Sequence, residues 1–237
     1  MTEKRDARLI KAQLDALRKR IRDAEGAAGR APGCVRLIAV SKTRPAEDLR
    51  SAYAAGQRDF GENYLQEAVA KMAALTDLAI TWHFIGPIQS NKSRTVAESF
   101  DWVHSVDRLK IARRLSEQRP HDRKPLNICL QVNVSREASK SGIDIEQLPA
   151  IAAEIAMLPN LRLRGLMAIP KPSDDPESQR TPFRILRVAL ERLQQQGPGL
   201  DTLSMGMTDD LEAAILEGAT LVRVGTAIFG ARHTHGT

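Results

Sequence analysis

The feature that most constrains the fold is a regular alternation of short apolar segments with amphipathic helical segments. Eight apolar segments are typical of buried β-strands, at residues 35–41, 58–61, 81–85, 102–106, 126–134, 161–169, 202–205 and 220–224. Helical patterns separate them at about residues 46–55, 63–75, 89–99, 107–118, 145–157, 177–196 and 208–217. Strands joined through helices pair in parallel, and eight such units close into a (β/α)8 barrel of the TIM type.

One more helix precedes the first strand. Its apolar positions alternate steps of four and three residues along one face, at Ile10, Leu14, Leu17, Ile21 and Ala24. We therefore expect residues 1–237 to form a single α/β barrel domain, with residues 1–30 packing on it as an N-terminal helix. An open doubly wound sheet is the alternative, but no Gly-x-Gly-x-x-Gly turn follows the first strand.

Composition limits the class of protein. Of the 237 residues, 42% are hydrophobic and 27% are charged, which is usual for a soluble globular chain. No stretch approaches the roughly 18 apolar residues of a membrane span, and the N-terminal residues lack the apolar core of a secretory signal. Cys34 and Cys129 have no metal-ligand spacing, so we expect reduced, buried thiols, no metal site and a cytoplasmic protein.

The net charge of +6 raises the question of a nucleic-acid partner. Basic residues gather in the opening helix and between residues 108 and 124, but acidic residues are interspersed in both segments. Neither segment interleaves aromatic side chains that could stack on bases. We interpret both as solvated helix faces and expect neither nucleic acid nor a membrane as partner.

A lysine stands at the end of the first predicted strand, in the string Val40-Ser41-Lys42-Thr43. The loops that follow barrel strands carry the active sites of TIM barrels. A lysine amine becomes a nucleophile where its surroundings lower its pKa. Taken by itself, this segment fits a solvated lysine just past a strand, which is the alternative.

The last two strands end in residues suited to an anion. Ser204 and Gly206 end strand seven, and Gly225 and Thr226 follow strand eight, where a short helical turn would expose backbone amides. A turn that only closes the barrel is the alternative. In a closed barrel strand one neighbours strand eight, so Lys42 and this cradle would lie within one small molecule's length. A phosphorylated aldehyde such as pyridoxal 5′-phosphate satisfies both.

Arg223 lies on strand eight itself, two residues before Gly225. A guanidinium is a donor only, so it can hydrogen-bond a pyridine nitrogen without readily protonating it. Such a partner would leave the ring a weaker electron sink than an aspartate would. An arginine that bridges carboxylates of the barrel is the structural alternative.

Several strings closely resemble the pyridoxal phosphate homeostasis protein family and together span nearly the whole chain after the first helix. They are Ala39-Val40-Ser41-Lys42-Thr43, Phe60-Gly61-Glu62-Asn63-Tyr64, Trp82-His83-Phe84-Ile85-Gly86, Gln89-Ser90-Asn91-Lys92, Ser139-Lys140-Ser141-Gly142, Arg164-Gly165-Leu166-Met167-Ala168-Ile169-Pro170 and the run from Leu203 to Arg232. The resemblance implies a barrel like the N-terminal domain of alanine racemase. It also implies that this barrel carries the cofactor as an aldimine on the lysine after strand one.

Carried over by motif, the resemblance makes Lys42 the Schiff-base lysine. Ser204, Gly225 and Thr226 would hold the phosphate, Arg223 would face the pyridine nitrogen, and Asn63 would line the pocket. His83 could also line it, although a histidine at the end of a strand is more often a satisfied core residue.

The family is understood to bind, buffer and deliver pyridoxal 5′-phosphate inside the cell, without established catalysis. Apo-enzymes that need the cofactor would then be transient partners. Lys140 could take part in transfer or be a solvated loop lysine. The C-terminal residues 233–237 lack the lysines that many relatives carry there, so we expect no mechanism that depends on a lysine-rich tail.

Two enzymatic alternatives use the same lysine. A racemase needs a second base, which related enzymes take from a tyrosine on an additional domain of a partner subunit. The tyrosines of this chain, Tyr53 and Tyr64, fall in helical segments after strands one and two. A Schiff-base aldolase acting on a sugar phosphate is the second alternative. We expect a monomeric carrier of the cofactor that has no catalytic residues.

Overall fold

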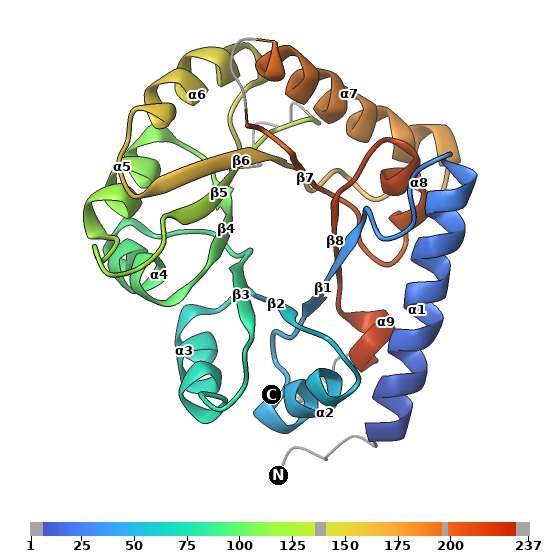
Figure 1. Cartoon of the computed structure of the whole chain (residues 1–237). Helices are drawn as coiled ribbons and strands as arrows, with labels where there is room; N and C mark the ends of the chain where they lie inside the picture. The colour runs from blue at the N-terminus through green and yellow to red at the C-terminus, as the bar shows by residue number, and fades with distance from the viewer. Residues whose placement is uncertain (1–6, 136–140, 196–198, 231–237) are drawn as a thin grey trace, which may run out of the picture.

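Eight parallel strands form a closed barrel in the order β1 to β8 (Figure 1), which confirms the predicted fold class. The computed structural model describes residues 7–135, 141–195 and 199–230. The strands are β1 (Arg36–Val40), β2 (Asp59–Glu62), β3 (Thr81–Phe84), β4 (Trp102–Val106), β5 (Leu126–Gln131), β6 (Leu161–Met167), β7 (Thr202–Ser204) and β8 (Leu221–Val224). Each lies within two or three residues of its predicted place.

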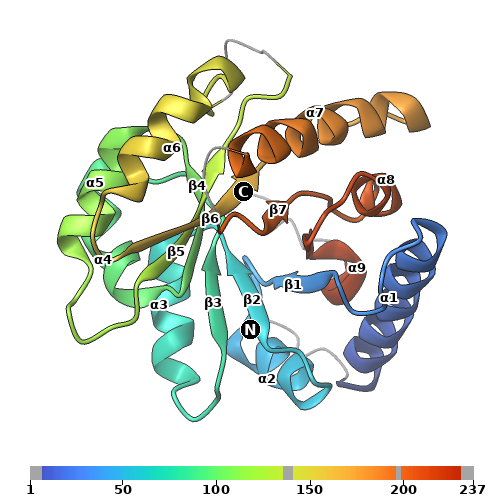
Figure 2. The ribbon, with the colours of Figure 1, turned by 45° about the horizontal axis from the view of Figure 1, so that its top comes forward.

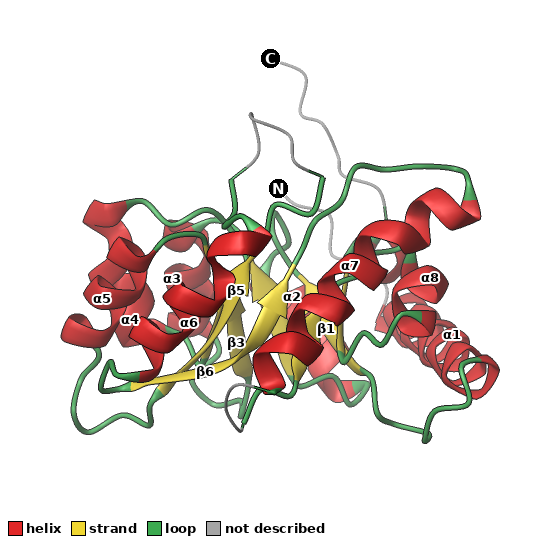
Figure 3. Cartoon of the chain, turned by 90° about the horizontal axis from the view of Figure 1, so that it is seen from above, coloured by secondary structure: helices red, strands yellow, loops and turns green. Residues whose placement is uncertain are grey.

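Helices surround the barrel (Figure 3), as crossover connections between parallel strands require. They are α1 (Ala7–Ala27), α2 (Ala46–Ala54), α3 (Leu65–Ala74), α4 (Ser93–Ser99), α5 (Leu109–Gln118), α6 (Leu148–Ala156), α7 (Pro176–Gln194), α8 (Leu211–Leu216) and α9 (Thr226–Phe229). Two of the predicted helices begin with a 3₁₀ turn, Ser90–Lys92 before α4 and Ile145–Gln147 before α6.

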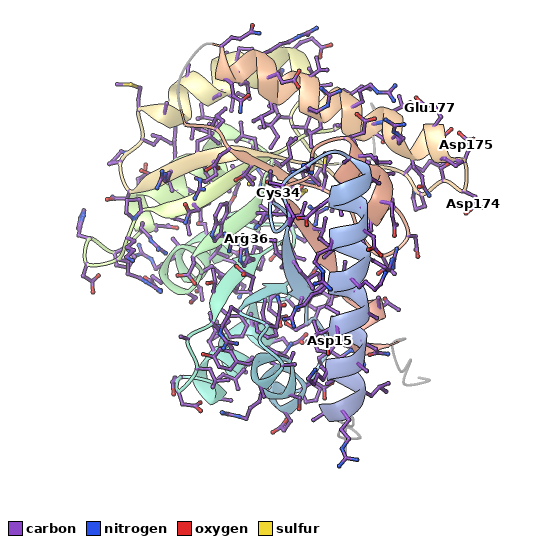
Figure 4. The ribbon with its side chains drawn as sticks, turned by 45° about the vertical axis from the view of Figure 1, so that its right-hand side comes forward. Asp15, Cys34, Arg36, Asp174, Asp175 and Glu177 are labelled. Atoms are coloured by element: carbon purple, nitrogen blue, oxygen red, sulfur yellow. The ribbon has the colours of Figure 1, made fainter. Side chains whose placement is uncertain are left out.

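The start of α7 is fixed by the residues at the end of the loop that follows β6. Asp175 accepts a hydrogen bond from the Ser178 amide at 2.8 Å, and Pro176 occupies the first helical turn. Asp174 and Glu177 lie beside it at the outer end of the helix (Figure 4). The loop between β6 and α7 thus leads directly into a capped helix.

The opening helix α1 packs along the outside of the barrel against α2, α8 and α9. Figure 2 shows α9 between β1 and α1. The buried residues of α1 are the predicted apolar positions together with Glu25. The Glu25 carboxylate accepts hydrogen bonds from the amides of Gly33 at 2.9 Å and Val35 at 2.8 Å. This buried carboxylate therefore fixes the turn that leads from α1 into β1.

The inside of the barrel is partly apolar and partly polar. Ile38, Trp102, Cys129, Met167 and Leu221 form an apolar cluster separate from the larger core between strands and helices. Buried polar side chains from β3, β4, β7 and β8, together with the partly buried Asp59 of β2, lie alongside it and bond to one another across the interior. The strand pattern alone did not predict this polar interior.

Within the described residues, no helix is long and apolar enough to cross a membrane.

Both described cysteines are free thiols. Cys129 is fully buried, and burial raises its pKa to about 12. Cys34 is only partly buried, because it lies in the turn that enters β1 rather than in the strand.

We expect the buried face of α1 to contribute strongly to stability. Leu14→Ala should lower the free energy of unfolding by about 2–5 kcal/mol, because Leu14 is fully buried and its removal leaves a cavity. Leu9→Ala on the same helix is the matched control, since Leu9 is 47% exposed. Urea denaturation of both variants measures the difference, and equal losses would contradict the packing of α1 on the barrel.

Candidate functional site

The turn that carries Lys42 and the loop after β8 lie side by side. β1 pairs with β8 in parallel, with Ala39 opposite Val224. A Cβ atom on Gly225 would lie 2.9 Å from the carbonyl oxygen of Val40, so only glycine fits there without a shift. The barrel thereby brings Lys42 next to the predicted anion cradle, as the sequence suggests.

A second contact joins the same two loops. The Arg44 guanidinium donates a hydrogen bond to the carbonyl oxygen of Gly230 at 2.6 Å. Gly230 ends α9, so this bond ties the loop after β1 to the end of the helix after β8. The two segments are thus linked both by strand pairing and by a side chain.

The residue after Lys42 is held in an unusual backbone conformation. Thr43 has φ of 63°, a left-handed conformation that costs a β-branched residue roughly 1–2 kcal/mol. Its amide donates a hydrogen bond to Glu67 Oε1 at 2.6 Å. A strained position of this kind persists only where its surroundings enforce it, and such positions cluster at functional sites.

A buried ion network lies behind this turn. Lys71 Nζ donates to the Ser41 carbonyl oxygen at 2.6 Å and to Glu62 Oε1 at 2.8 Å, and it also contacts Glu67 Oε1. Ser41 Oγ donates to Glu62 Oε1 at 2.6 Å. Lys71 is 5% exposed and Glu62 is fully buried. The network therefore fixes Ser41 and Thr43, the two residues on either side of Lys42.

Burial raises the pKa of Glu62 above its usual value, although the charge and hydrogen bond of Lys71 act in the opposite direction. The sequence alone predicts only one contact of this network. Glu67 and Lys71 stand four residues apart, which indicates a helical ion pair. Nothing in the sequence shows that this pair is buried beneath the first strand's loop.

Asn63 follows β2 and lines a cavity of about 360 Å³ at the ends of the neighbouring strands, together with Ile85, Ser105 and Gln131. Its Oδ1 atom is buried and has no hydrogen-bond partner among the described residues. A Cβ atom on Gly86 would come within 2.1 Å of the Asn63 carbonyl oxygen, so this backbone is closely packed. An acceptor without a partner, beside a cavity, suits a ligand that donates a hydrogen bond.

Gly225 and Thr226 open α9 directly after β8. The first amides of a helix have no partner within the helix, so they point outward and favour an anion. The Thr226 side chain is exposed and Gly225 is partly buried. These residues, at the loop beside Lys42, can bind an anionic group.

Arg223 is buried inside the barrel, where it donates to Ser204 Oγ at 2.7 Å and to the Ala168 carbonyl oxygen at 2.9 Å. Both of these acceptors are uncharged, so the two bonds do not form the predicted alternative, a bridge between barrel carboxylates. Burial lowers the pKa of Arg223 to about 10, which still leaves it a cation at neutral pH.

The geometry does not favour the sequence-based assignment of Ser204 to a phosphate. Its hydroxyl accepts from Arg223, and it lies 2.7 Å from His104 Nδ1 across the barrel interior. A phosphate needs donors, and a serine has only one O–H to give. Ser204 ends β7 with its side chain turned inward, which the strand pattern alone did not resolve.

His83 is the satisfied core residue that its position suggested. It is fully buried and bonded to Asp59 Oδ1 and to His104 Nε2, both at 2.9 Å. Lys140 and residues 233–237 lie outside the described residues. In the part of the chain that the structure describes, no three His, Cys, Asp or Glu side chains are placed to hold a metal ion.

The chain is similar to proteins of one family over nearly its whole length. The family model of the alanine racemase N-terminal domain matches residues 12–233. The chain is 67% identical over 213 residues to the pyridoxal phosphate homeostasis protein of Pseudomonas aeruginosa, covering 90% of this chain and 91% of the relative. It is 53% identical over 226 residues to that of Escherichia coli, covering 94% and 97%.

Solved structures agree with these relatives. PipY of Synechococcus elongatus with PLP bound superposes with a TM-score of 0.82 at 42% identity, covering 93% of this chain and 100% of that one. Alanine racemase of Corynebacterium glutamicum gives a TM-score of 0.67 at 18% identity, covering 94% and 63%. At that identity the second likeness concerns the fold alone.

We expect the buried Glu62 to make stability depend on pH. Between the ordinary carboxyl value of 4.5 and its raised folded pKa, the folded protein keeps a proton that the unfolded chain has released. The free energy of unfolding therefore falls as pH rises through this window, by about 1.4 kcal/mol for each unit of the shift. Glu62→Gln lacks this loss, so its stability relative to the wild type should rise with pH.

Urea denaturation of the wild type and Glu62→Gln between pH 4.5 and pH 7 measures this difference. Glu98→Gln, which removes an exposed carboxylate on α4, controls for the loss of one negative charge. A stability difference that stays constant or falls with pH would contradict the raised pKa of Glu62.

Proposed function

The chain belongs to the alanine racemase N-terminal domain family and, within it, to the pyridoxal phosphate homeostasis proteins, and we propose that it binds pyridoxal 5′-phosphate at the carboxyl ends of its barrel strands. The finer proposal is that it holds the cofactor reversibly on Lys42 and serves its storage and delivery inside the cell. The observation that carries the proposal is the pairing of β1 with β8, which brings the Lys42 turn beside Gly225.

Lys42 supplies the amine in this proposal. Its nitrogen forms a C=N bond with the aldehyde carbon of the cofactor, and the aldehyde oxygen leaves as water. The reverse reaction with water releases the cofactor, as a carrier requires. The buried Glu62–Lys71 network and the Glu67 bond to Thr43 hold the turn, so the amine needs little ordering when the cofactor arrives.

Gly225 and Thr226 bind the phosphate in this proposal. Their backbone amides lie at the start of α9, and the Thr226 hydroxyl adds a further donor. We do not assign the phosphate to Ser204, because its hydroxyl accepts from Arg223 and lies 2.7 Å from His104 Nδ1 in the barrel interior. The Asn63 side chain, whose Oδ1 lacks a partner among the described residues, lines the cavity at the ends of the neighbouring strands and would offer an acceptor to the cofactor.

Arg223 faces the pyridine nitrogen in this proposal. Its guanidinium stays protonated at neutral pH, so it donates a hydrogen bond to the ring without giving up a proton. The bound cofactor supplies an electrophilic aldehyde and a ring that withdraws electrons, and an arginine partner keeps that withdrawal weak. This favours holding the cofactor over carbanion chemistry.

The described tyrosines also favour a carrier over a racemase. Tyr53 lies in α2, with its ring beneath Arg58 and its hydroxyl accepting from the Ala79 amide at 3.3 Å. Tyr64 stands at the start of α3 with 53% of its side chain exposed. Tyr53 is held by these contacts on the helix layer, and we assign the second, opposing base that racemisation requires to neither tyrosine. Apo-enzymes that need the cofactor are the proposed transient partners, and we propose a monomer with a single barrel domain.

The lysine assignment predicts one covalent adduct. Purified protein mixed with pyridoxal 5′-phosphate should absorb in the visible range, and borohydride should bleach it and fix the cofactor on the peptide that contains Lys42. Mass spectrometry of the digest locates the adduct. Lys42→Ala should abolish it, whereas Lys92→Ala, which removes a lysine from the 3₁₀ turn before α4, should not.

An adduct on another lysine, or one spread over many, would contradict the role of Lys42. A protein that forms no coloured adduct but condenses with a sugar phosphate would support the aldolase alternative instead.

The carrier function predicts that L-alanine keeps its optical rotation in the presence of the loaded protein. The expected loss of rotation equals that with free cofactor alone, because the proposal assigns an opposing base to neither described tyrosine. Polarimetry over several hours at increasing protein concentration measures it. Turnover that scales with the protein and disappears in Lys42→Ala would establish a racemase and overturn the carrier proposal.

A further inference from the structure

A continuous line of hydrogen bonds crosses the interior of the barrel. It runs from Asp59 to His83 Nε2 at 2.9 Å, from His83 Nδ1 to His104 Nε2 at 2.9 Å, and from His104 Nδ1 to Ser204 Oγ at 2.7 Å. Arg223 completes it with a bond to Ser204 Oγ at 2.7 Å. β4 and β7 are not neighbours in the barrel, so the bond between His104 and Ser204 must pass through its centre.

The chemistry of the two ends fixes the direction of every bond between them. A guanidinium only donates, so Ser204 Oγ accepts from Arg223. An ionised carboxylate only accepts, so His83 donates to Asp59 from Nε2. Neutral His83 then accepts at Nδ1 from His104 Nε2–H, and His104 accepts at Nδ1 from the Ser204 hydroxyl. Both neutral histidines carry their proton on Nε2.

The reverse direction would need His83 protonated on both nitrogens. Burial opposes this, because it lowers the pKa of His83 and lowers that of His104 well below its usual value. Burial alone would raise the pKa of Asp59, but the hydrogen bond from His83 and the charge of Arg36 hold it below the usual value. Asp59 therefore stays ionised while both histidines stay neutral.

The line also links two opposite charges through the barrel. Arg223 is 4% exposed, and a buried cation needs compensation. The hydroxyl and the two imidazole dipoles all point their negative ends toward Arg223 and their positive ends toward Asp59. Hydrogen bonds aligned in this way polarise one another, which strengthens each. At the other end, Asp59 contacts Arg36 and lines a cavity of about 350 Å³ at the amino end of β2.

We propose that Asp59, His83, His104 and Ser204 are positioning residues that orient the Arg223 guanidinium toward the cofactor ring nitrogen. We call these four residues the relay. Ser204 and the Ala168 carbonyl oxygen accept two of the Arg223 N–H groups, and the other N–H groups remain for the ring nitrogen. The relay holds both histidines as neutral Nε2–H tautomers. This inference rests on the proposed function in one respect, namely that Arg223 faces the pyridine ring.

The tautomers can be tested without cofactor. In apo protein with ¹⁵N-labelled histidine, long-range proton–nitrogen correlation spectra distinguish a protonated ring nitrogen from a bare one. We expect two histidines to show Nδ1 unprotonated and Nε2 protonated at neutral pH. The exposed His121 serves as an internal reference. His83→Gln and His104→Gln assign the signals. An imidazolium, or an Nδ1–H tautomer at either position, overturns the relay.

Ser204 variants test the effect on Arg223. Ser204→Ala should shift the His104 Nδ1 resonance and weaken cofactor binding about tenfold or more, since a hydrogen bond to a charged group is lost. It should also move the visible absorption band of the loaded protein. Ser204→Thr retains the hydroxyl and should restore both. Ser116→Ala removes a buried serine hydroxyl on α5, outside the barrel interior, and should change neither.

Failure of the relay and failure of the proposed function give different results. A wild type that forms the Lys42 adduct, combined with unchanged binding and spectrum in Ser204→Ala, overturns the relay alone. A wild type that forms no adduct overturns the proposed function, and the tautomers of the apo protein then decide the relay separately. If Ser204→Ala fails to fold, rescue in Ser204→Thr and the wild-type tautomers decide it.

Discussion

Closure of the barrel between β1 and β8 is the constraint on which the rest of the structure depends. Four residue pairs, from Arg36 with Leu221 to Ala39 with Val224, align these strands in parallel. Both strands therefore end at the same level, and the loops that follow them meet. The amine of one loop and the backbone amides of the other come from opposite ends of the chain, so no local segment could form this site by itself.

Two buried cations support the site from behind, and both are compensated. Lys71 is paired with Glu62 and Glu67 beneath the Lys42 turn. Arg223 is bonded to Ser204 and to a carbonyl oxygen, and the relay connects it to Asp59. A buried charge without partners would be costly, so each network holds its charged group in one place. The apolar side chains of the barrel interior, including Trp102 and Met167, lie alongside the bonds of Arg223 and the relay, where a low dielectric strengthens them.

Much of the fold could be predicted, because hydrophobic periodicity and the residues that end helices and strands are local properties of the sequence. Apolar runs and helical periodicity placed all eight strands within a few residues. Site residues were harder to predict. Gly225, Thr226 and Lys42 follow strand ends, where position alone indicates a rim. Ser204 also ends a strand, yet its hydroxyl lies inside, because the direction of a side chain depends on register and tilt. His104 gave no local signal, and the spacing of Glu67 and Lys71 indicates a helical ion pair without showing that it is buried.

The amino-acid sequence by itself determined the architecture and the family, since alternating periodicity dictates the barrel and long motifs identify relatives. It also determined which groups could react, because an amine, an anion cradle and a donor-only guanidinium are properties of residue types. Only the tertiary structure decided which of these groups meet. Contacts such as His104 with Ser204 join residues 100 positions apart, and they arise from a closed sheet whose interior side chains face one another.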